Sequence, residues 1–308
     1  MTTRICIFLL LLALSLTMQA EEEWTFLDAE HRHDSTQNEI WLSADQPGIG
    51  TGSEIIAPRH LQWELGFDVT HIPGLHMIGL PNSVFRYGVH KRVEIRLEYA
   101  GALMIKDKPD SDPESPDHYL YAPSPLWLGT KVMLCDHHAG NKQLRGVPRT
   151  SIMVELGLPL TPSMAKYQPI SGTIDMLFEN EVTEWFSIGY NLGVYWIDWA
   201  PTPDLFASLT LDFEINNRWG LFLESYNTFD PDAISLNTGK RYTHCDLNMD
   251  FGVTYAVHPR VQLDASAGFN LYNDEPSFNG PKNYVFVGLG VTWLIYHPKQ
   301  RIKRIPNK

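Results

Sequence analysis

Cysteine is scarce in this sequence, with three occurrences among 308 residues. Cys6 lies in an apolar N-terminal stretch, so only Cys135 and Cys245 belong to the remainder of the chain. Two isolated cysteines cannot build a disulfide scaffold, and a structural zinc site needs clustered ligands. We therefore predict no metal site and no cofactor.

Long apolar runs are missing after the first twenty residues. A helix needs about 20 predominantly apolar residues to cross a bilayer. Lipid offers no partner to a backbone polar group, so only helices and closed barrels can span a membrane. If this chain resides in a membrane, it must cross with strands.

Basic residues are also few, 24 against 36 acidic ones, and the net charge is −12. Binding to phosphate groups needs a basic surface, so we expect no nucleic-acid partner. Five bases gather after residue 296: Lys299, Arg301, Lys303, Arg304 and Lys308. We interpret residues 297–308 as a solvated basic tail.

The first twenty residues have the features of an export signal. Arg4 supplies a positive charge, residues 5–16 are apolar but too short to span a bilayer, and Ala20 precedes an acidic stretch. This arrangement is typical of a signal peptide over residues 1–20. Its removal would leave 23 basic and 36 acidic residues, a net charge of −13.

Alternation of apolar with polar residues dominates the rest of the chain. In residues 250–270, apolar side chains occupy every second position on both arms of a hairpin around Pro259. A period of two predicts strands with one apolar and one polar face. The pattern recurs, and we predict about twelve strands between residues 59 and 296.

The predicted connections differ in length on alternate sides of the strands. Tight turns follow most even-numbered strands, whereas most odd-numbered strands are followed by long loops: residues 71–81, 106–124, 159–170, 229–241 and 272–283. Short turns on one rim and long loops on the other are typical of outer-membrane barrels. Long alternating runs and aromatic residues near strand ends favour that fold over a soluble sandwich.

The fold prediction is an all-β protein, a transmembrane antiparallel up-and-down β-barrel of about 12 strands in the bacterial outer membrane. Residues 59–296 would form the barrel. Residues 21–58 are polar and irregular, and we predict a periplasmic N-terminal lead-in that either stays outside or enters the barrel. The oligomeric state is left open.

Charged residues fall mainly on the polar face of the predicted strands, and we expect them to line the lumen. They are Glu64, Asp68, Arg86, Glu94, Arg96, Glu98, Lys131, Glu155, Asp175, Glu179, Asp212, Glu214, Glu224, Asp246, Asp250 and Asp264. An excess of carboxylates would favour cations in a wet lumen. Alternatively, these groups pair across strands and satisfy one another.

Several segments resemble one known family. They include RYGVHKRVEIRLEY (residues 86–99), PLWLGTKVML (125–134) and FSIGYNLGVYW (186–196), and the resemblance extends from residue 45 to residue 293. The sequence is similar to the outer-membrane transporter-like family named for the meta pathway of phenol degradation. Members usually open with an Asp-Arg-Pro-like segment, and residues 44–47 here lack the arginine. The resemblance implies a porin-like barrel that passes small, aromatic or hydrophobic molecules, with no catalytic residues.

Two other classes of function were weighed against a passive channel with outer-membrane lipid and small solutes as its partners. A surface receptor or adhesin would act through outer loops, of which residues 106–124 form the longest. A barrel hydrolase would need a nucleophile beside a base, and His244 with Asp246 lacks a serine partner. Histidines 31, 33, 137 and 138 are interpreted as solvated. We predict that the protein is not an enzyme.

Overall fold

The computed structural model describes residues 42–45, 48–79, 81–106, 119–136, 138–139, 142–143, 147–160, 170–197, 202–234, 239–273 and 284–296. The predicted signal peptide and basic tail lie outside these residues. Within the described ranges, no helix is both long and apolar enough to cross a membrane.

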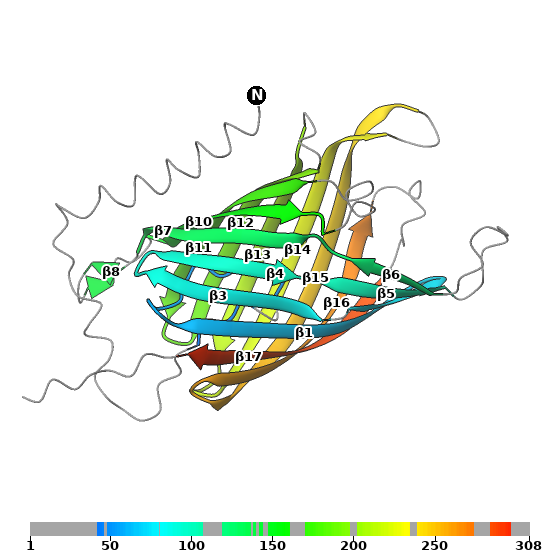
Figure 1. The fold of residues 1–308 in the computed structure, drawn as a ribbon. Helices are drawn as coiled ribbons and strands as arrows, with labels where there is room; N and C mark the ends of the chain where they lie inside the picture. The colour runs from blue at the N-terminus through cyan, green and yellow to red at the C-terminus, as the bar shows by residue number, and fades with distance from the viewer. Residues whose placement is uncertain are drawn as a thin grey trace, which may run out of the picture. The chain divides into compact units, whose positions relative to one another are not determined.

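Twelve strands form a closed antiparallel barrel (Figure 1). Each of them pairs with the barrel strand that precedes it in the sequence. The last strand pairs with the first over a register that runs from Leu61↔Tyr296 to His71↔Val285. The predicted up-and-down barrel of about 12 strands is therefore confirmed. Its strands are β1 (Leu61–Ile72), β3 (Asn82–His90), β4 (Val93–Tyr99), β7 (Leu126–Cys135), β10 (Arg149–Leu158), β11 (Ser171–Thr183), β12 (Phe186–Ile197), β13 (Asp204–Glu214), β14 (Trp219–Ile234), β15 (Arg241–His258), β16 (Val261–Asn273) and β17 (Val285–Tyr296).

Three shorter strands extend the sheet beyond the closed barrel. They are β2 (Leu75–Gly79), β5 (Gly101–Lys106) and β6 (Tyr119–Pro123), and they follow β1 in the order β1-β2-β5-β6. The sequence predicted a loop over residues 71–81, which is wrong because β1 and β2 form a hairpin there. Its turn is closed by Gly74, whose φ of 88° suits glycine.

The chain divides into two compact units, of which the barrel unit is the larger. The smaller unit includes residues 138–144. Its described part is the pair of two-residue strands β8 (His138–Ala139) and β9 (Lys142–Gln143). Their register joins residue 138 to residue 143 and residue 139 to residue 142.

Strand β14 continues farther than the sequence predicts. A loop was expected over residues 229–241, yet β14 extends to Ile234 and pairs with β15. The pairing shifts register between Asp230 and Ala233, so Pro231 lies at an irregularity where its missing N–H does not interrupt the ladder.

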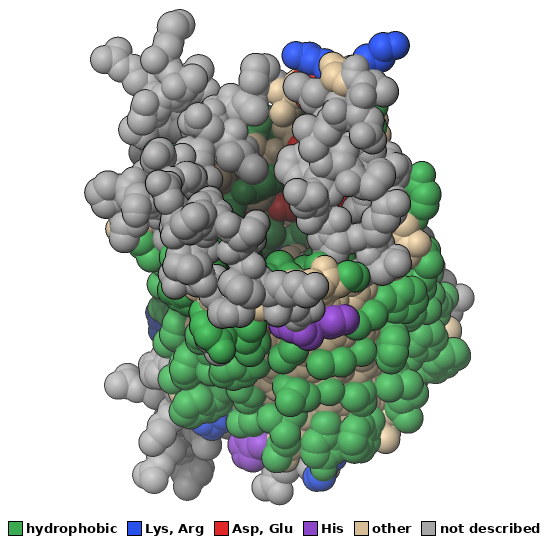
Figure 2. Space-filling model, turned by 90° about the vertical axis from the view of Figure 1, so that its right-hand side faces the viewer, with side chains coloured by type: hydrophobic (Ala, Val, Ile, Leu, Met, Phe, Trp, Pro, Cys, Tyr) green, Lys and Arg blue, Asp and Glu red, His purple; other side chains and the backbone are tan. Residues whose placement is uncertain are grey.

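The two faces of the barrel differ in chemistry as the alternation predicts. On β17, Val287 and Leu289 are 59% and 67% exposed, and Figure 2 shows many hydrophobic side chains on the face of the barrel in view. Glu64 and Glu94, which lie on the opposite parity, have 0% exposure. An apolar band facing out around a polar interior is the arrangement of barrels that reside in lipid.

Glycines make room for inward-facing carboxylates. Asp264 lies directly across from Gly290 in the register, and Asp175 lies across from Gly193. A Cβ atom added at either glycine would collide with the carboxylate of its partner. The interior can therefore hold charged side chains flat against the wall.

Candidate functional site

An irregular segment that precedes β1 contacts inward-facing side chains across the interior of the barrel. We call residues 42–45 and 48–60 the inner segment. Near its end, Arg59 N donates to Gly88 O at 2.7 Å, and Gly88 N donates to His60 O at 3.1 Å. A Cβ atom at Gly88 would overlap the carbonyl groups of Ile56 and Ala57. Glycine at this position therefore allows the backbone of the inner segment to lie against β3.

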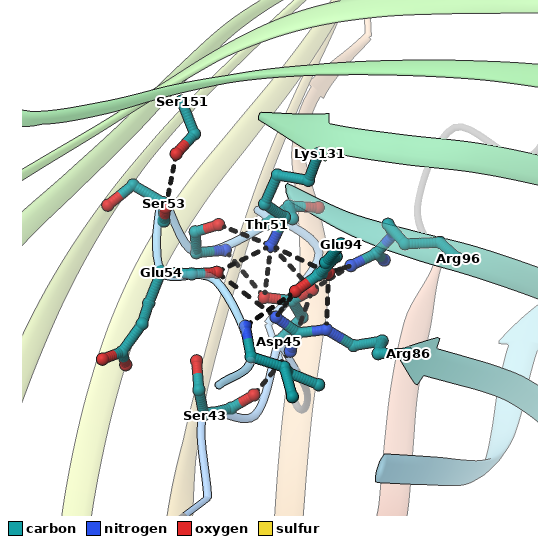
Figure 3. A network of polar contacts seen from close by, with 12 residues as sticks. Ser43, Asp45, Thr51, Ser53, Glu54, Arg86, Glu94, Arg96, Lys131 and Ser151 are labelled. Atoms are coloured by element: carbon teal, nitrogen blue, oxygen red, sulfur yellow. Dashed lines mark hydrogen bonds and ion pairs between the residues drawn. The ribbon is translucent and has the colours of Figure 1, made fainter. Parts of the chain in front are cut away.

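Asp45 is the central anion of the inner segment. Its carboxylate lies 3.2 Å from Arg86 Nη1 of β3 and 3.2 Å from Lys131 Nζ of β7, and it also pairs with Arg96 of β4. Figure 3 shows these side chains converging on Asp45. Burial alone would raise the pKa of Asp45, but the charges of Arg86, Lys131 and Arg96 outweigh it and hold the pKa well below its ordinary value. Asp45 is therefore ionised throughout the physiological range.

The same three cations also pair with carboxylates of the barrel wall. Arg86 lies 2.9 Å from Glu64 and 2.8 Å from Glu94, and Arg96 lies 2.5 Å from Glu98. Arg86 and Lys131 have no exposed surface. Buried charges are tolerated only when paired and hydrogen-bonded, so this cluster can exist only with its anions in place.

Backbone carbonyl groups of the inner segment complete the coordination of these cations. Arg86 Nη1 donates to Ser43 O at 2.5 Å, and Lys131 Nζ donates to Gly52 O at 2.9 Å and to Glu54 O at 3.3 Å. The guanidinium group of Arg86 and the ammonium group of Lys131 thus bind both the carboxylate of Asp45 and backbone carbonyl groups of the segment. Its path is fixed by side chains of the wall, since it has no regular secondary structure of its own.

The opposite wall holds the tip of the inner segment. Glu224 of β14 accepts hydrogen bonds from Ile49 N at 2.6 Å and from Gly50 N at 2.8 Å. Between the two walls, Asn191 of β12 donates to Thr51 O at 2.9 Å. The segment therefore bridges the interior from β1, β3, β4 and β7 to β14.

Beyond the ion-paired cluster, the wall from β11 to β16 is rich in carboxylates. The inward carboxylates on these strands include Asp175, Glu179, Asp212, Glu224, Asp246, Asp250 and Asp264. Arg149 of β10 pairs with Glu179 at 3.3 Å and with Glu181 at 3.5 Å. Glu224 and Asp250 lie directly across from each other in the register. Carboxyl groups therefore gather on one side of the interior.

The structure places the predicted lumen residues at three levels of burial. Nine are buried: Glu64, Arg86, Glu94, Arg96, Lys131, Glu155, Glu224, Asp250 and Asp264. Six are half-buried: Asp68, Glu98, Asp175, Glu179, Asp212 and Asp246. Glu214, at the end of β13, is exposed.

Sequence reasoning missed the inner-segment residues that complete the network. Asp45 belongs to the segment that the family resemblance singled out, but alternation gives no signal there. Ser53 donates to Glu179 at 2.9 Å and accepts at its carbonyl group from Ser151 at 2.6 Å, and neither contact could be inferred from spacing. The sequence also gave no sign that Arg149 would pair with Glu179.

His244 and Asp246, the candidate residues for a hydrolase site, both lie on β15. Asp246 accepts hydrogen bonds from Asn270 at 2.6 Å and from Asn248 at 3.3 Å. The ring of His244 meets the ring of Tyr242 edge-on, with centroids 6.2 Å apart. Asp246 is thus part of a network of side-chain amides.

A cavity of about 720 Å³ lies against the inner segment. The inner segment contributes Asp45 and residues 48–51 to its lining. The barrel wall contributes aromatic and apolar side chains, among them Tyr226, Tyr284 and Phe286, together with the acidic Asp264. Such a mixed lining suits a small molecule with an apolar body and a polar group.

A family profile described as "Putative MetA-pathway of phenol degradation" matches residues 44–294 of the chain. The chain belongs to this family. The match to the phenol-degradation family begins within the inner segment and ends near the last residues of β17, so the segment is part of the same domain as the barrel.

Solved structures are similar to this phenol-degradation family member at low sequence identity. An outer membrane channel from Pseudomonas putida F1 has 11% identity and a TM-score of 0.58, over 80% of this chain and 98% of that chain. The NanC porin has 7% identity and a TM-score of 0.49, over 75% of this chain and 98% of that chain. No curated protein matches the sequence.

Proposed function

We propose that this protein is a passive channel of the bacterial outer membrane for small solutes, in which the inner segment sets the width of the path. The inner segment supports this proposal. It crosses the interior of a closed barrel, is held by buried ion pairs at Asp45 and by Glu224, and borders a cavity of about 720 Å³. The apolar exterior supports a place in lipid.

The direction of the barrel in the membrane follows from its rims. Tight turns at residues 91–92, 184–185 and 259–260 lie on the rim where β1 begins. Outer-membrane barrels carry short turns on the periplasmic side. In this proposal the inner segment therefore enters from the periplasm, as the predicted lead-in over residues 21–58 would.

The solutes we propose are small aromatic or hydrophobic compounds that are neutral or positively charged. The family description points to phenolic compounds. Tyr226, Tyr284 and Phe286 in the cavity wall would contact an aromatic ring, and Asp264 would favour a donor or a cation. The predicted lumen residues would thus act through their negative excess on the wall from β11 to β16.

Ion selectivity in a planar bilayer tests the proposal. Under a KCl gradient, the reversal potential should show preference for K⁺, and the variant Asp264→Asn should reduce that preference. Glu184→Gln, in an exposed tight turn, serves as the control and should leave it unchanged. Preference for Cl⁻, or no conductance above that of the lipid, would refute the proposal.

Flux of charged aromatic solutes tests the proposed substrate class. Trimethylphenylammonium and benzoate carry similar rings and opposite charges. Liposome swelling should be faster with trimethylphenylammonium, because carboxylates on the wall raise the local concentration of cations. Equal rates, or a faster rate with benzoate, would contradict the proposed selectivity.

A further inference from the structure

We propose that His71 and His76 form a binding site for a transition-metal ion such as Zn²⁺ on the β1–β2 hairpin. The two residues face each other directly across antiparallel strands, next to the turn at residues 73–74. Cross-strand partners have Cβ atoms about 4.5 to 5.5 Å apart, close enough for both rings to reach one ion.

The separation of the two ring nitrogens fits a tetrahedral metal. Nδ1 of His71 lies 3.3 Å from Nδ1 of His76, and the ring centroids are 4.7 Å apart. Two nitrogens at about 2.0 to 2.1 Å from a tetrahedral zinc ion lie about 3.3 to 3.4 Å apart, whereas a right angle at the metal would require about 2.9 Å. The hairpin therefore already holds the two donors at the required distance.

The same nitrogens form a hydrogen bond in the absence of metal, and binding would replace it. One Nδ1 carries the shared proton in the neutral pair, and that proton moves to Nε2 of the same ring when both Nδ1 atoms bind the ion. Neutral imidazole is the binding form, so no net proton is released from a neutral pair.

The chemistry of the donors selects the class of metal. Imidazole nitrogen binds Zn²⁺, Cu²⁺ and Ni²⁺, whereas Mg²⁺ and Ca²⁺ prefer oxygen donors. His71 is exposed and His76 is half-buried, so an ion can reach the site from solution. No group of three or more His, Cys, Asp or Glu that could hold a metal was found among the described residues, so water would complete the coordination shell.

A metal ion bound at this hairpin would lie close to residues that line the cavity. Ile72, adjacent to His71, and Met77, adjacent to His76, both line the cavity. A bridging ion adds a link between β1 and β2 at this point, so it would restrain one wall of the proposed path. Metal binding itself does not depend on the proposed channel function.

Titration calorimetry of the full-length protein in detergent tests the site, with Zn²⁺ as the probe. The variants His71→Ala and His76→Ala should each lower the affinity at one site by about 100-fold or more, because a single remaining imidazole loses the chelate advantage. His90→Ala removes another exposed histidine and should leave that affinity unchanged. Mg²⁺ should give no heat that depends on His71 or His76.

Chemical protection gives a second measurement that needs no variant. Zn²⁺ should slow the modification of His71 and His76 by diethyl pyrocarbonate in wild-type protein, while His90 is modified at the same rate with and without Zn²⁺. Unchanged Zn²⁺ affinity in both alanine variants, or no protection of the two histidines, would overturn the proposal.

Discussion

Asp45 and Lys131 are 86 positions apart in the sequence, yet Lys131 Nζ lies 3.2 Å from Asp45 Oδ2 inside the barrel. Arg86 and Arg96 reach the same carboxylate from neighbouring strands. Three strands of the wall therefore fasten the inner segment through one side chain.

Replacing Asp45 by Asn should loosen the inner segment. Removing one partner of a buried ion pair typically costs about 3 to 5 kcal/mol, because the remaining charges stay buried without compensation. We expect a lower guanidinium midpoint, a larger single-channel conductance, or both. Asp232→Asn is the matched control, since the pair of Asp232 with Arg241 is exposed and such pairs contribute about 0 to 1 kcal/mol. Wild-type conductance and midpoint in Asp45→Asn would contradict the role of this anion.

Acidification should release the inner segment only at low pH. The pKa of Asp45 is lowered in the folded protein, so its stabilising contribution is complete above its unfolded value of about 3.9 and is lost progressively as pH falls from there through the lower folded value. Conductance should therefore stay level from about pH 7 to pH 5 and rise below about pH 4. Other carboxylates titrate in the same range, so the test compares the pH dependence of conductance in the wild-type protein with that in Asp45→Asn. The part of the rise that is due to Asp45 should be missing in the variant.

Gly88→Ala should displace the inner segment by contact alone, without a change of charge. The new methyl group would meet the backbone carbonyl groups of Ile56 and Ala57. Overpacking of this kind commonly costs about 1 to 3 kcal/mol, and we expect altered conductance at unchanged ion selectivity. Gly189→Ala is the control, because its Cβ would have 3.7 Å to the nearest atom, in Thr210. The same effect from both variants would show that the inner segment is not responsible.

Leu289→Arg should destabilise the protein in vesicles. Leu289 is 67% exposed on the apolar outer face of β17. Arginine facing lipid at mid-membrane depth costs about 2 to 4 kcal/mol. Asn217→Arg, in the exposed turn between β13 and β14, should change the free energy of unfolding little. Equal unfolding midpoints for the two variants would mean that Leu289 does not face lipid.

Alternation was sufficient to predict the strands and their faces, because period two is a local property of the chain. Leu289 is exposed and Asp264 is buried, and charged residues of β3, β4 and β7 lie close to one another. The partners of those charges were not predictable, since Asp45 lies in an irregular stretch. Its position depends on the side chains that receive it and not on a repeating pattern.

The structure differs from the prediction at two strand ends. Residues 71–81 were expected to form one long loop, whereas β1 and β2 form a hairpin that brings His71 beside His76. A loop was expected from residue 229, yet β14 continues past Pro231 to Ile234. In both places pairing with a neighbouring strand outweighs the local preference, and that pairing is visible only in three dimensions.

The inner segment is joined to β1 directly after His60, so it cannot diffuse away when its contacts break. Its return is an intramolecular step governed by the effective concentration that this short tether imposes. Dilution of the protein would leave the equilibrium between docked and released segment unchanged. A peptide of the same sequence added from outside would have to compete with the covalently attached inner segment for the same contacts.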